Sequence, residues 1–178
     1  MDSKLHQNRR AATEAEAKAL ASTIRLRILR LCLDRALTNK EIAALLEANP
    51  ATTLHHVRTL VTTGFLAPQE ERRGNRNSRE VPYLATGKSW TLNVRDTGVP
   101  GGQQAMVGAF LEELGLLDMD NELINMARLG LRLTEDEYSE LNLRLATLLA
   151  EYADRQPSAG GRAYSMFVVL HPDVLRDA

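Results

Sequence analysis

The 178 residues carry a formal net charge of −1, with 44% hydrophobic but only 4% aromatic residues and a single cysteine. This composition favours a mainly helical core of Leu, Ala and Val, and one thiol excludes both a disulfide framework and a zinc site of several thiolates. There is no apolar N-terminal signal region and no run of 18 apolar residues, so we expect a soluble protein of the cytoplasm with no membrane partner.

The small net charge hides an uneven distribution. Residues 1–95 hold 16 Lys/Arg against 9 Asp/Glu, a balance of +7, whereas residues 96–178 hold 6 against 14, a balance of −8. A basic half beside an acidic half indicates one surface for a polyanion and another that is kept away from it. Chance segregation of charge is the alternative.

Two helices are predicted at the start of the chain. Residues 13–21 (TEAEAKALA) are rich in alanine, and Thr13 can cap the first turn. Residues 22–33 (STIRLRILRLCL) place apolar side chains on one face at helical spacing and three arginines on the other. We interpret the arginines as a solvated face; contact with the DNA backbone is the alternative. We interpret Cys32, within the apolar run, as a small core residue rather than a sensor thiol.

Residues 38–66 (TNKEIAALLEANPATTLHHVRTLVTTGFL) predict two helices joined by a tight turn. Thr38 and Glu41 have the spacing of a capping box at the start of the first helix. The second helix begins at Asn49 and Pro50, a side-chain cap followed by proline at the first helical position. Gly64 ends it with a residue that tolerates the left-handed conformation.

The second of these helices has two different faces. Thr53, Val57, Leu60 and Val61 form a core-facing stripe at helical spacing, and the opposite face carries hydroxyls, imidazoles and a guanidinium, without an acid. Such groups donate to phosphates or base edges. The candidate DNA-contacting residues of this helix are Thr52, Thr53, His55, His56, Arg58 and Thr59, with Thr53 counted in both sets.

This polar face has two other interpretations. An ordinary solvated helix face is the first. A metal site at the adjacent His55 and His56 is the second, but neighbouring helical residues point about 100° apart and make a poor ligand pair. We therefore expect neither a metal nor a cofactor.

Three segments in this order, residues 19–31, 38–46 and 49–66, resemble the ArsR-type winged helix-turn-helix repressors of bacteria. The resemblance covers about residues 16–93, and it implies a DNA-binding repressor whose recognition helix includes Thr52, His55, His56 and Arg58. Leu54 departs from the pattern, because such proteins often carry a small polar residue there. Metal-sensing members often carry a cysteine pair in the first helix of the motif, and residues 40–47 contain none.

A β-hairpin is predicted after Gly64, with one strand beginning at residues 65–66 and the other at residues 81–85. Its tip, RRGNRNSR, is rich in arginine and turn-forming residues, and it matches the wing of the resembled family. We expect the arginines of the tip to contact phosphate; they are Arg72, Arg73, Arg76 and Arg79. The Gly/Pro-rich residues 95–103 then predict a boundary between a DNA-binding domain, 1–95, and a C-terminal domain, 96–178.

The C-terminal half predicts a helix over residues 105–117, followed by a strand, a helix and a strand. In the resembled family the helix after the wing commonly pairs between subunits, so the candidate dimer interface is Met106, Phe110, Leu114 and Leu117. Residues 127–133 alternate with period two, Thr134 and Glu137 form a second capping box, and residues 164–170 are apolar on both faces. This order predicts a crossover unit with parallel strands, packed on the preceding helix or paired with a second subunit.

The predicted fold class is therefore α+β, mainly α: a winged helix-turn-helix followed by a helix and a strand-helix-strand unit. No catalytic constellation is visible, so we expect no enzyme. The predicted function is a sequence-specific regulator, a repressor by resemblance, that binds double-stranded DNA as a homodimer on an inverted repeat. Two alternatives stay open: a winged-helix adaptor for protein–protein contact, and a DNA-binding regulator without the small-molecule effector that the C-terminal domain could sense.

Overall fold

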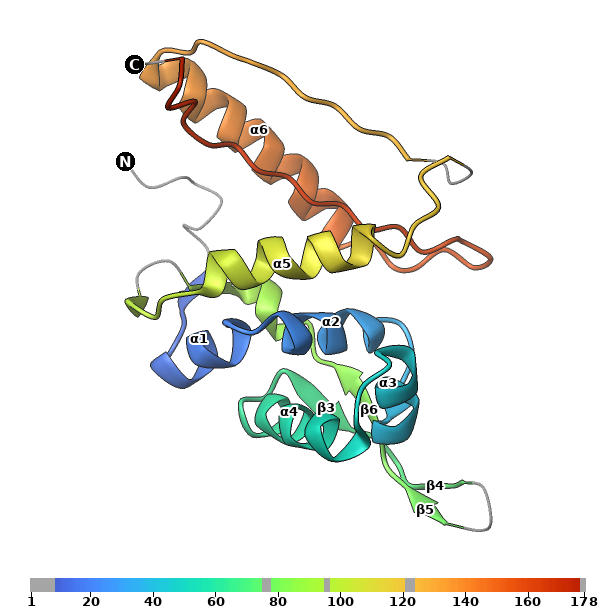
Figure 1. Cartoon of the computed structure of the whole chain (residues 1–178). Coiled ribbons are helices and arrows are strands. Elements are labelled where there is room, and N and C mark those ends of the chain that lie inside the picture. The colour runs from blue at the N-terminus through green and yellow to red at the C-terminus, as the bar shows by residue number, and fades with distance from the viewer. Residues whose placement is uncertain (1–8, 75–77, 95–96, 121–123, 177–178) are drawn as a thin grey trace. The chain divides into compact units, whose positions relative to one another are not determined.

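The computed structural model describes residues 9–74, 78–94, 97–120 and 124–176, and it contains two compact units (Figure 1). One unit comprises Asn8–Gly115 and the other includes Leu116–Ala178. The expected mainly helical α+β class is confirmed.

The first unit combines helices with short strands. Its helices are α1 (Glu14–Leu20), α2 (Thr23–Leu31), α3 (Asn39–Leu45), α4 (Pro50–Thr62) and α5 (Gly102–Leu114). Its strands are β1 (Arg10–Ala11), β2 (Leu37–Thr38), β3 (Leu66–Pro68), β4 (Arg72–Arg73), β5 (Arg79–Glu80), β6 (Pro82–Ala85) and β7 (Leu92–Asn93), with a 3-10 turn, η3 (Lys88–Thr91).

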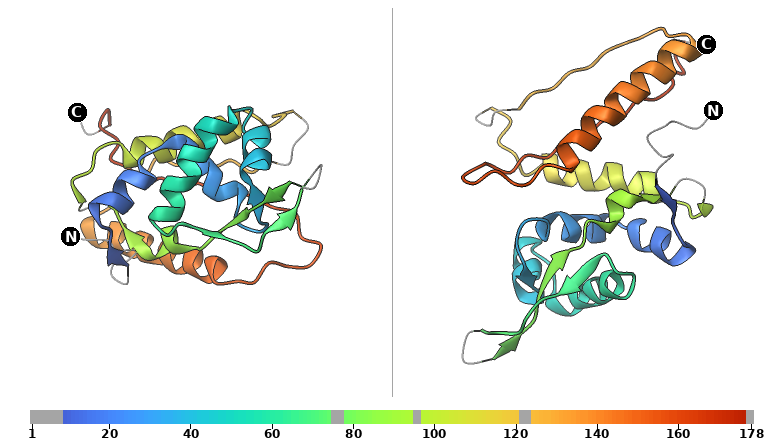
Figure 2. Two further views of the ribbon diagram at one scale, coloured as in Figure 1. Left: turned by 90° about the horizontal axis from the view of Figure 1, so that it is seen from below. Right: turned by 180° about the vertical axis from the view of Figure 1, so that it is seen from behind.

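Three small sheets hold these segments together. The central sheet is antiparallel in the order β2-β6-β3, β4 and β5 form an antiparallel hairpin, and β1 pairs in parallel with β7. Figures 1 and 2 show the β4–β5 hairpin projecting away from the helices of this unit. The predicted hairpin after Gly64 is therefore confirmed: β3 pairs with β6 in the central sheet, and β4 pairs with β5 beyond it.

The core of the first unit lies where α2, α3 and α4 meet the central sheet. Ile28, Ile42, Val57 and Leu60, one or two from each helix, have no exposed surface. Cys32 is equally buried, and burial raises the pKa of its thiol to about 11. The apolar stripes expected on α2 and α4 are confirmed, whereas on α3 Ile42 is buried and Leu45 is exposed. Cys32 is a core residue held as the neutral thiol.

The predicted helix boundaries depend on side-chain caps that the structure contains. Thr38 and Glu41 make both hydrogen bonds of the capping box at α3. Asn49 Oδ1 accepts from the Ala51 amide at 2.8 Å at the start of α4, and Pro50 occupies its first turn. Gly64 follows α4 with φ of +76°, a conformation that glycine adopts without the steric cost of a Cβ atom.

Helix α5 packs against α1 and α2 and so belongs to the first unit. Ala105 and Ala109 are buried on its inner face. At Gly108 a Cβ atom would lie 3.0 Å from the hydroxyl of Thr23, so the missing side chain allows α5 to approach α2 closely. The division between the units therefore follows Gly115 rather than residue 95.

The arginines of α2 are engaged with neighbouring elements. Arg27 Nη1 lies 2.7 Å from a carboxylate oxygen of Glu112, and Arg30 Nε lies 3.5 Å from Glu113, both on α5. Arg25 donates to the carbonyls of Lys18 and Ala19 at the end of α1. The interpretation of these arginines as a solvated face was wrong for Arg25 and Arg27, which are half-buried against other helices, whereas Arg30 is exposed.

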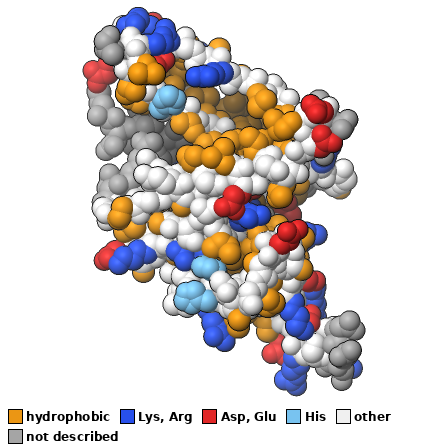
Figure 3. Space-filling model, viewed as in Figure 1, with side chains coloured by type: hydrophobic (Ala, Val, Ile, Leu, Met, Phe, Trp, Pro, Cys, Tyr) orange, Lys and Arg blue, Asp and Glu red, His pale blue; other side chains and the backbone are white. Residues whose placement is uncertain are grey.

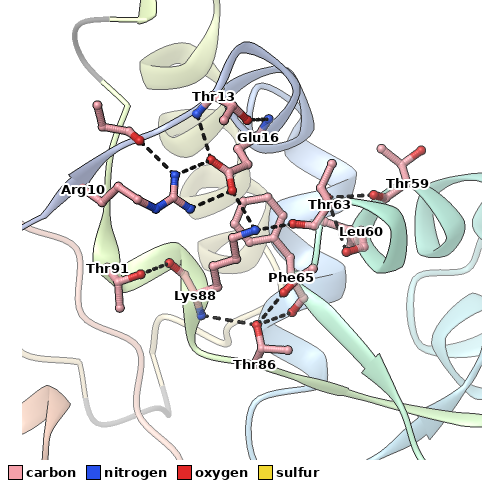
Figure 4. A network of polar contacts seen from close by, with 12 residues as sticks. Arg10, Thr13, Glu16, Thr59, Leu60, Thr63, Phe65, Thr86, Lys88 and Thr91 are labelled. Atoms are coloured by element: carbon pink, nitrogen blue, oxygen red, sulfur yellow. Dashed lines mark hydrogen bonds and ion pairs between the residues drawn. The ribbon is translucent and has the colours of Figure 1, made fainter.

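A buried carboxylate connects the start of α1 with the end of α4 (Figure 4). Glu16 is only 7% exposed; it accepts from Arg10 at 2.8 and 2.9 Å and lies 2.7 Å from Lys88 Nζ. Lys88 also donates to the Thr63 carbonyl at 2.6 Å, which caps the C-terminus of α4. The hydrogen bonds from Arg10, and then from Lys88, hold the pKa of Glu16 well below its usual range.

The second unit is organised around α6 (Glu135–Ala153), which begins with the predicted capping box of Thr134 and Glu137. The two predicted strands are absent: residues 127–133 and 164–170 have no regular secondary structure. The prediction of a parallel crossover unit was wrong for one copy of the chain. A period-two pattern specifies two faces but no pairing partner, and two strands alone form a marginal sheet.

Among the described residues, no helix combines the length and the apolar character needed to span a membrane.

Replacing Lys88 with methionine should destabilise the first unit by about 1–3 kcal/mol, the usual range for a buried hydrogen bond to a charged group. Glu16→Gln should also destabilise the first unit at pH 7. Because the pKa of Glu16 is depressed in the folded state, this contribution is present above the unfolded value of about 4.3 and is lost as the pH falls further. Urea unfolding at pH 7 and at about pH 3.5, below that unfolded value, measures both effects.

Lys18→Met provides the matched control, since Lys18 pairs with Glu14 and both side chains are about two-thirds exposed. An exposed pair of this kind contributes little to stability. Equal destabilisation by Lys18→Met and Lys88→Met would contradict the role assigned to the buried network.

Candidate nucleic-acid interface

Helix α4 presents a polar face to solvent because its other face is fully occupied by the core. Thr52, His55 and Arg58 are exposed, and Thr59 is half-buried with its hydroxyl donating to the His55 carbonyl at 3.0 Å. In the space-filling view, histidine and Lys/Arg side chains lie on the surface over α4 and the hairpin (Figure 3). This face offers donors of several kinds within about two turns of the helix N-terminus.

Thr53 does not belong to this face. Its side chain has no exposed surface, and its hydroxyl donates to the Asn49 carbonyl at 3.0 Å. The inclusion of Thr53 among DNA-contacting residues was therefore wrong. Its position in the same stripe as Val57 and Leu60, which the sequence showed, was the correct signal.

His56 lies at the edge of the exposed face and is half-buried. Burial lowers the pKa of His56, and the nearby Arg25 and His55 lower it further. Its ring contacts that of His55 edge to face, with 5.5 Å between centroids. These surroundings favour the neutral form of His56, and the structure shows no hydrogen-bond partner for its buried Nδ1 among the described residues. In this form the ring can donate or accept a hydrogen bond.

The hairpin β4–β5 is braced against α3 by ion pairs. Arg72 Nη2 lies 2.6 Å from both carboxylate oxygens of Glu41, and Lys40 lies 3.0 Å from Glu80. Glu41 thus completes the capping box and holds the hairpin at once. Hydrogen bonding from the Thr38 amide, followed by the Thr38 hydroxyl and Arg72, lowers the pKa of Glu41. Sequence reasoning missed this brace, because it assigned Glu41 only a local partner.

Arg73 and Arg79, the other described arginines of the hairpin, are less engaged with neighbouring residues than Arg72. Arg73 is exposed, and the Arg79 side chain is 87% exposed, with a carboxylate oxygen of Glu71 at 3.8 Å. With Arg72 and Glu71 these residues line a hollow at the hairpin. Arg76, also predicted to contact phosphate, lies outside the described residues.

Helix α5 carries apolar side chains on the side opposite Ala105 and Ala109. Met106, Val107 and Leu111 are 47%, 41% and 58% exposed, and Phe110 and Leu114 are half-buried. Leu117, the last of the predicted dimer residues, lies beyond the end of α5 and in the second unit. The predicted interface thus retains Met106, Phe110 and Leu114 on one helix, and the exposure adds Val107 and Leu111.

The comparison with protein families matches residues 22–67 to the family described as "Bacterial regulatory protein, arsR family". No curated protein matches the chain significantly. Among solved structures, reduced HlyU from Vibrio cholerae is 20% identical, with 58% of this chain and 87% of that chain covered and a TM-score of 0.35. The transcriptional regulator SlyA is 19% identical, with coverages of 74% and 75% and a TM-score of 0.31. A mutant ZitR from Lactococcus lactis in apo form is 20% identical, with coverages of 76% and 86% and a TM-score of 0.31.

The order α2, α3, α4 and hairpin defines a winged helix-turn-helix, the class of DNA-binding transcriptional regulators. The matched residues 22–67 contain α2, α3 and α4, so this part of the chain is similar to the arsR family of bacterial regulatory proteins. In this class α4 is the recognition helix and the β4–β5 hairpin is the wing.

Replacing Arg73 or Arg79 with alanine should weaken DNA binding. Each phosphate contact that a substitution removes should flatten the slope of log affinity against log salt concentration by about 1. Sequence preference should change little, because phosphate contacts carry no base information. Titrations of a labelled duplex at several salt concentrations measure the slope.

Arg144→Ala, which removes an exposed arginine from α6, serves as the control and should leave the slope unchanged. Arg72 is unsuitable for this test, since its removal also breaks the brace to Glu41. Unchanged slopes for both Arg73→Ala and Arg79→Ala would exclude a phosphate role for the wing.

Proposed function

We propose that this chain is a homodimeric repressor of transcription that binds an inverted repeat in double-stranded DNA with sequence specificity. The observation that carries the proposal is the division of α4 into two faces. Thr53, Val57 and Leu60 have no exposed surface, so the helix cannot rotate without opening the core. Thr52, His55 and Arg58 are consequently held toward solvent in one orientation.

The dimensions of α4 fit a major groove. Its 13 residues give a length of about 20 Å at 1.5 Å per residue, and B-DNA accepts a helix in a major groove about 12 Å wide. His55 lies near the centre of the exposed face, where a recognition helix approaches base edges, and Arg58 lies toward its edge, where phosphates are nearer. The wing arginines would then contact the flanking backbone.

The outward apolar face of α5 supports assembly as a dimer. Met106, Val107 and Leu111 place exposed apolar surface on a helix whose other side is anchored by Ala105 and Ala109. A two-fold axis through such a face would pair α5 with the α5 of a second copy. Two recognition helices related by that axis bind half-sites about one helical turn apart, and occupation of such an operator blocks transcription.

His55→Ala should reduce discrimination between operator and random DNA by about five-fold, the low end for removal of a base contact, because a single imidazole makes at most one such contact. Arg58→Ala should weaken binding to both DNAs by similar factors, since a phosphate contact is present on any sequence. Paired titrations of each variant with both duplexes at one salt concentration provide the comparison.

Equal weakening on both duplexes for His55→Ala would mean that His55 reads no base and that the assigned orientation of α4 is wrong. Failure of the unmodified chain to bind any duplex at low salt would favour the adaptor alternative over DNA binding. Thr53→Ser is the control for a change in the helix core. The serine hydroxyl can keep the buried hydrogen bond to the Asn49 carbonyl, and the side chain is not exposed, so discrimination between the two duplexes should not change.

Replacing both Val107 and Leu111 with glutamate should convert the dimer into monomers and weaken operator binding by at least about 100-fold, since each half-site alone is bound weakly. These side chains are exposed, so the first unit should still fold. Leu33→Glu is the control, because Leu33 is 48% exposed outside α5. Sedimentation at micromolar concentration measures the assembly, and an unmodified chain that is already a monomer would overturn the dimer.

A further inference from the structure

The described residues of the second unit form almost no core of their own. Of the described residues of α6, only Ala146 is buried. Large apolar side chains remain open to solvent on α6, among them Leu143, Leu148 and Tyr152, which are 40%, 48% and 56% exposed. Figure 3 shows apolar side chains on the surface over this helix. Apolar surface on this scale marks a site that another molecule covers.

The segments on either side of α6 have the sequence pattern of β-strands, but they form no backbone hydrogen-bond ladder with another strand. In residues 124–133, Leu129, Leu131 and Leu133 lie on alternate positions and are 78%, 44% and 37% exposed. In residues 162–170, Tyr164 and Met166 are 74% and 68% exposed. None of the residues in either segment takes part in a sheet, so both can serve as templates for strand pairing.

The number of such segments favours a second copy of this chain as the partner. Two strands make a marginal sheet, whereas three or more with an apolar face packed on a helix are stable. One copy supplies two segments and one helix, and two copies supply four segments and two helices. A two-fold axis brings identical segments together, as a self-complementary interface requires.

The charge distribution of the second unit also favours a second copy of this chain as the partner. Residues 124–133 carry Arg128 and Arg132 and no acid, while the first turn of α6 carries Glu135, Asp136 and Glu137. In a two-fold arrangement, the basic segment of one copy would complement the charge of the acidic helix start of the other. Opposite charges across an interface favour correct register and suppress other partners.

We propose that residues 124–133 and 162–170 of two copies form one intersubunit sheet that covers the apolar faces of both α6 helices. This proposal rests on the homodimer proposed above and extends its interface from α5 to the second unit. The unit would then acquire its core on assembly.

Hydrogen exchange of the full-length protein at concentrations above and below dimer dissociation tests the proposal. In the dimer, the amides of residues 124–133 and 162–170 should exchange at least about ten-fold more slowly than in the monomer. The amides of α4 should stay protected at both concentrations, because the core of the first unit is internal to one copy.

A substitution inside the segment provides an independent test. Leu131→Pro removes an amide donor from the predicted ladder in both copies and should weaken dimerisation by about ten-fold. Ala159→Pro, in the loop between α6 and the second segment, should leave dimerisation unchanged. The exchange measurement on the unmodified chain decides the proposal even if Leu131→Pro fails to fold.

Protection that persists in the monomer would show that the segments pair within one chain and would overturn the proposal. Exposed segments in a chain that is nevertheless a dimer would overturn it as well, while leaving the dimer and DNA binding intact. A chain that is monomeric at every concentration would contradict both proposals. Loss of DNA binding alone would contradict only the regulator function.

Discussion

The rotation of α4 about its own axis is the constraint on which the interface depends. Thr53, Val57 and Leu60 contribute no exposed surface. Rotation of the helix by one residue would bring either Arg58 or the polar side chains of Thr52, His56 and Thr59 into the core. Burying such a group costs several times the thermal energy. The three buried side chains therefore stabilise the core and also determine which side chains of α4 face solvent.

Charged groups then fix the elements around α4. Lys88 caps its C-terminus and is itself held by the buried Glu16, while Glu41 on α3 holds Arg72 of the wing. These interactions tie α1, α3, α4 and the wing into one unit without relying on a large sheet. The ion pair between Glu41 and Arg72 has a further effect. It holds Arg72 against α3, while Arg73 and Arg79 remain exposed to solvent.

Local patterns made much of this unit predictable from the sequence. The capping boxes, the Asn49–Pro50 start and the apolar stripes each depend on residues close together in the chain, and each was confirmed. The partners of the α2 arginines and of Glu16 were not foreseen, because they come from other elements. The prediction of strands beside α6 was wrong for the same reason. An alternating apolar pattern shows that a segment has two faces, but it does not show which segment will pair with it.

Selection of bound duplexes from a random pool measures DNA recognition and dimer symmetry together, and so tests the proposed function most directly. We expect enrichment of an inverted repeat whose half-sites lie about 10 base pairs apart, centre to centre, because two recognition helices related by a two-fold axis contact one face of the duplex. Enrichment of no sequence, or of a single site without symmetry, would contradict the proposed function.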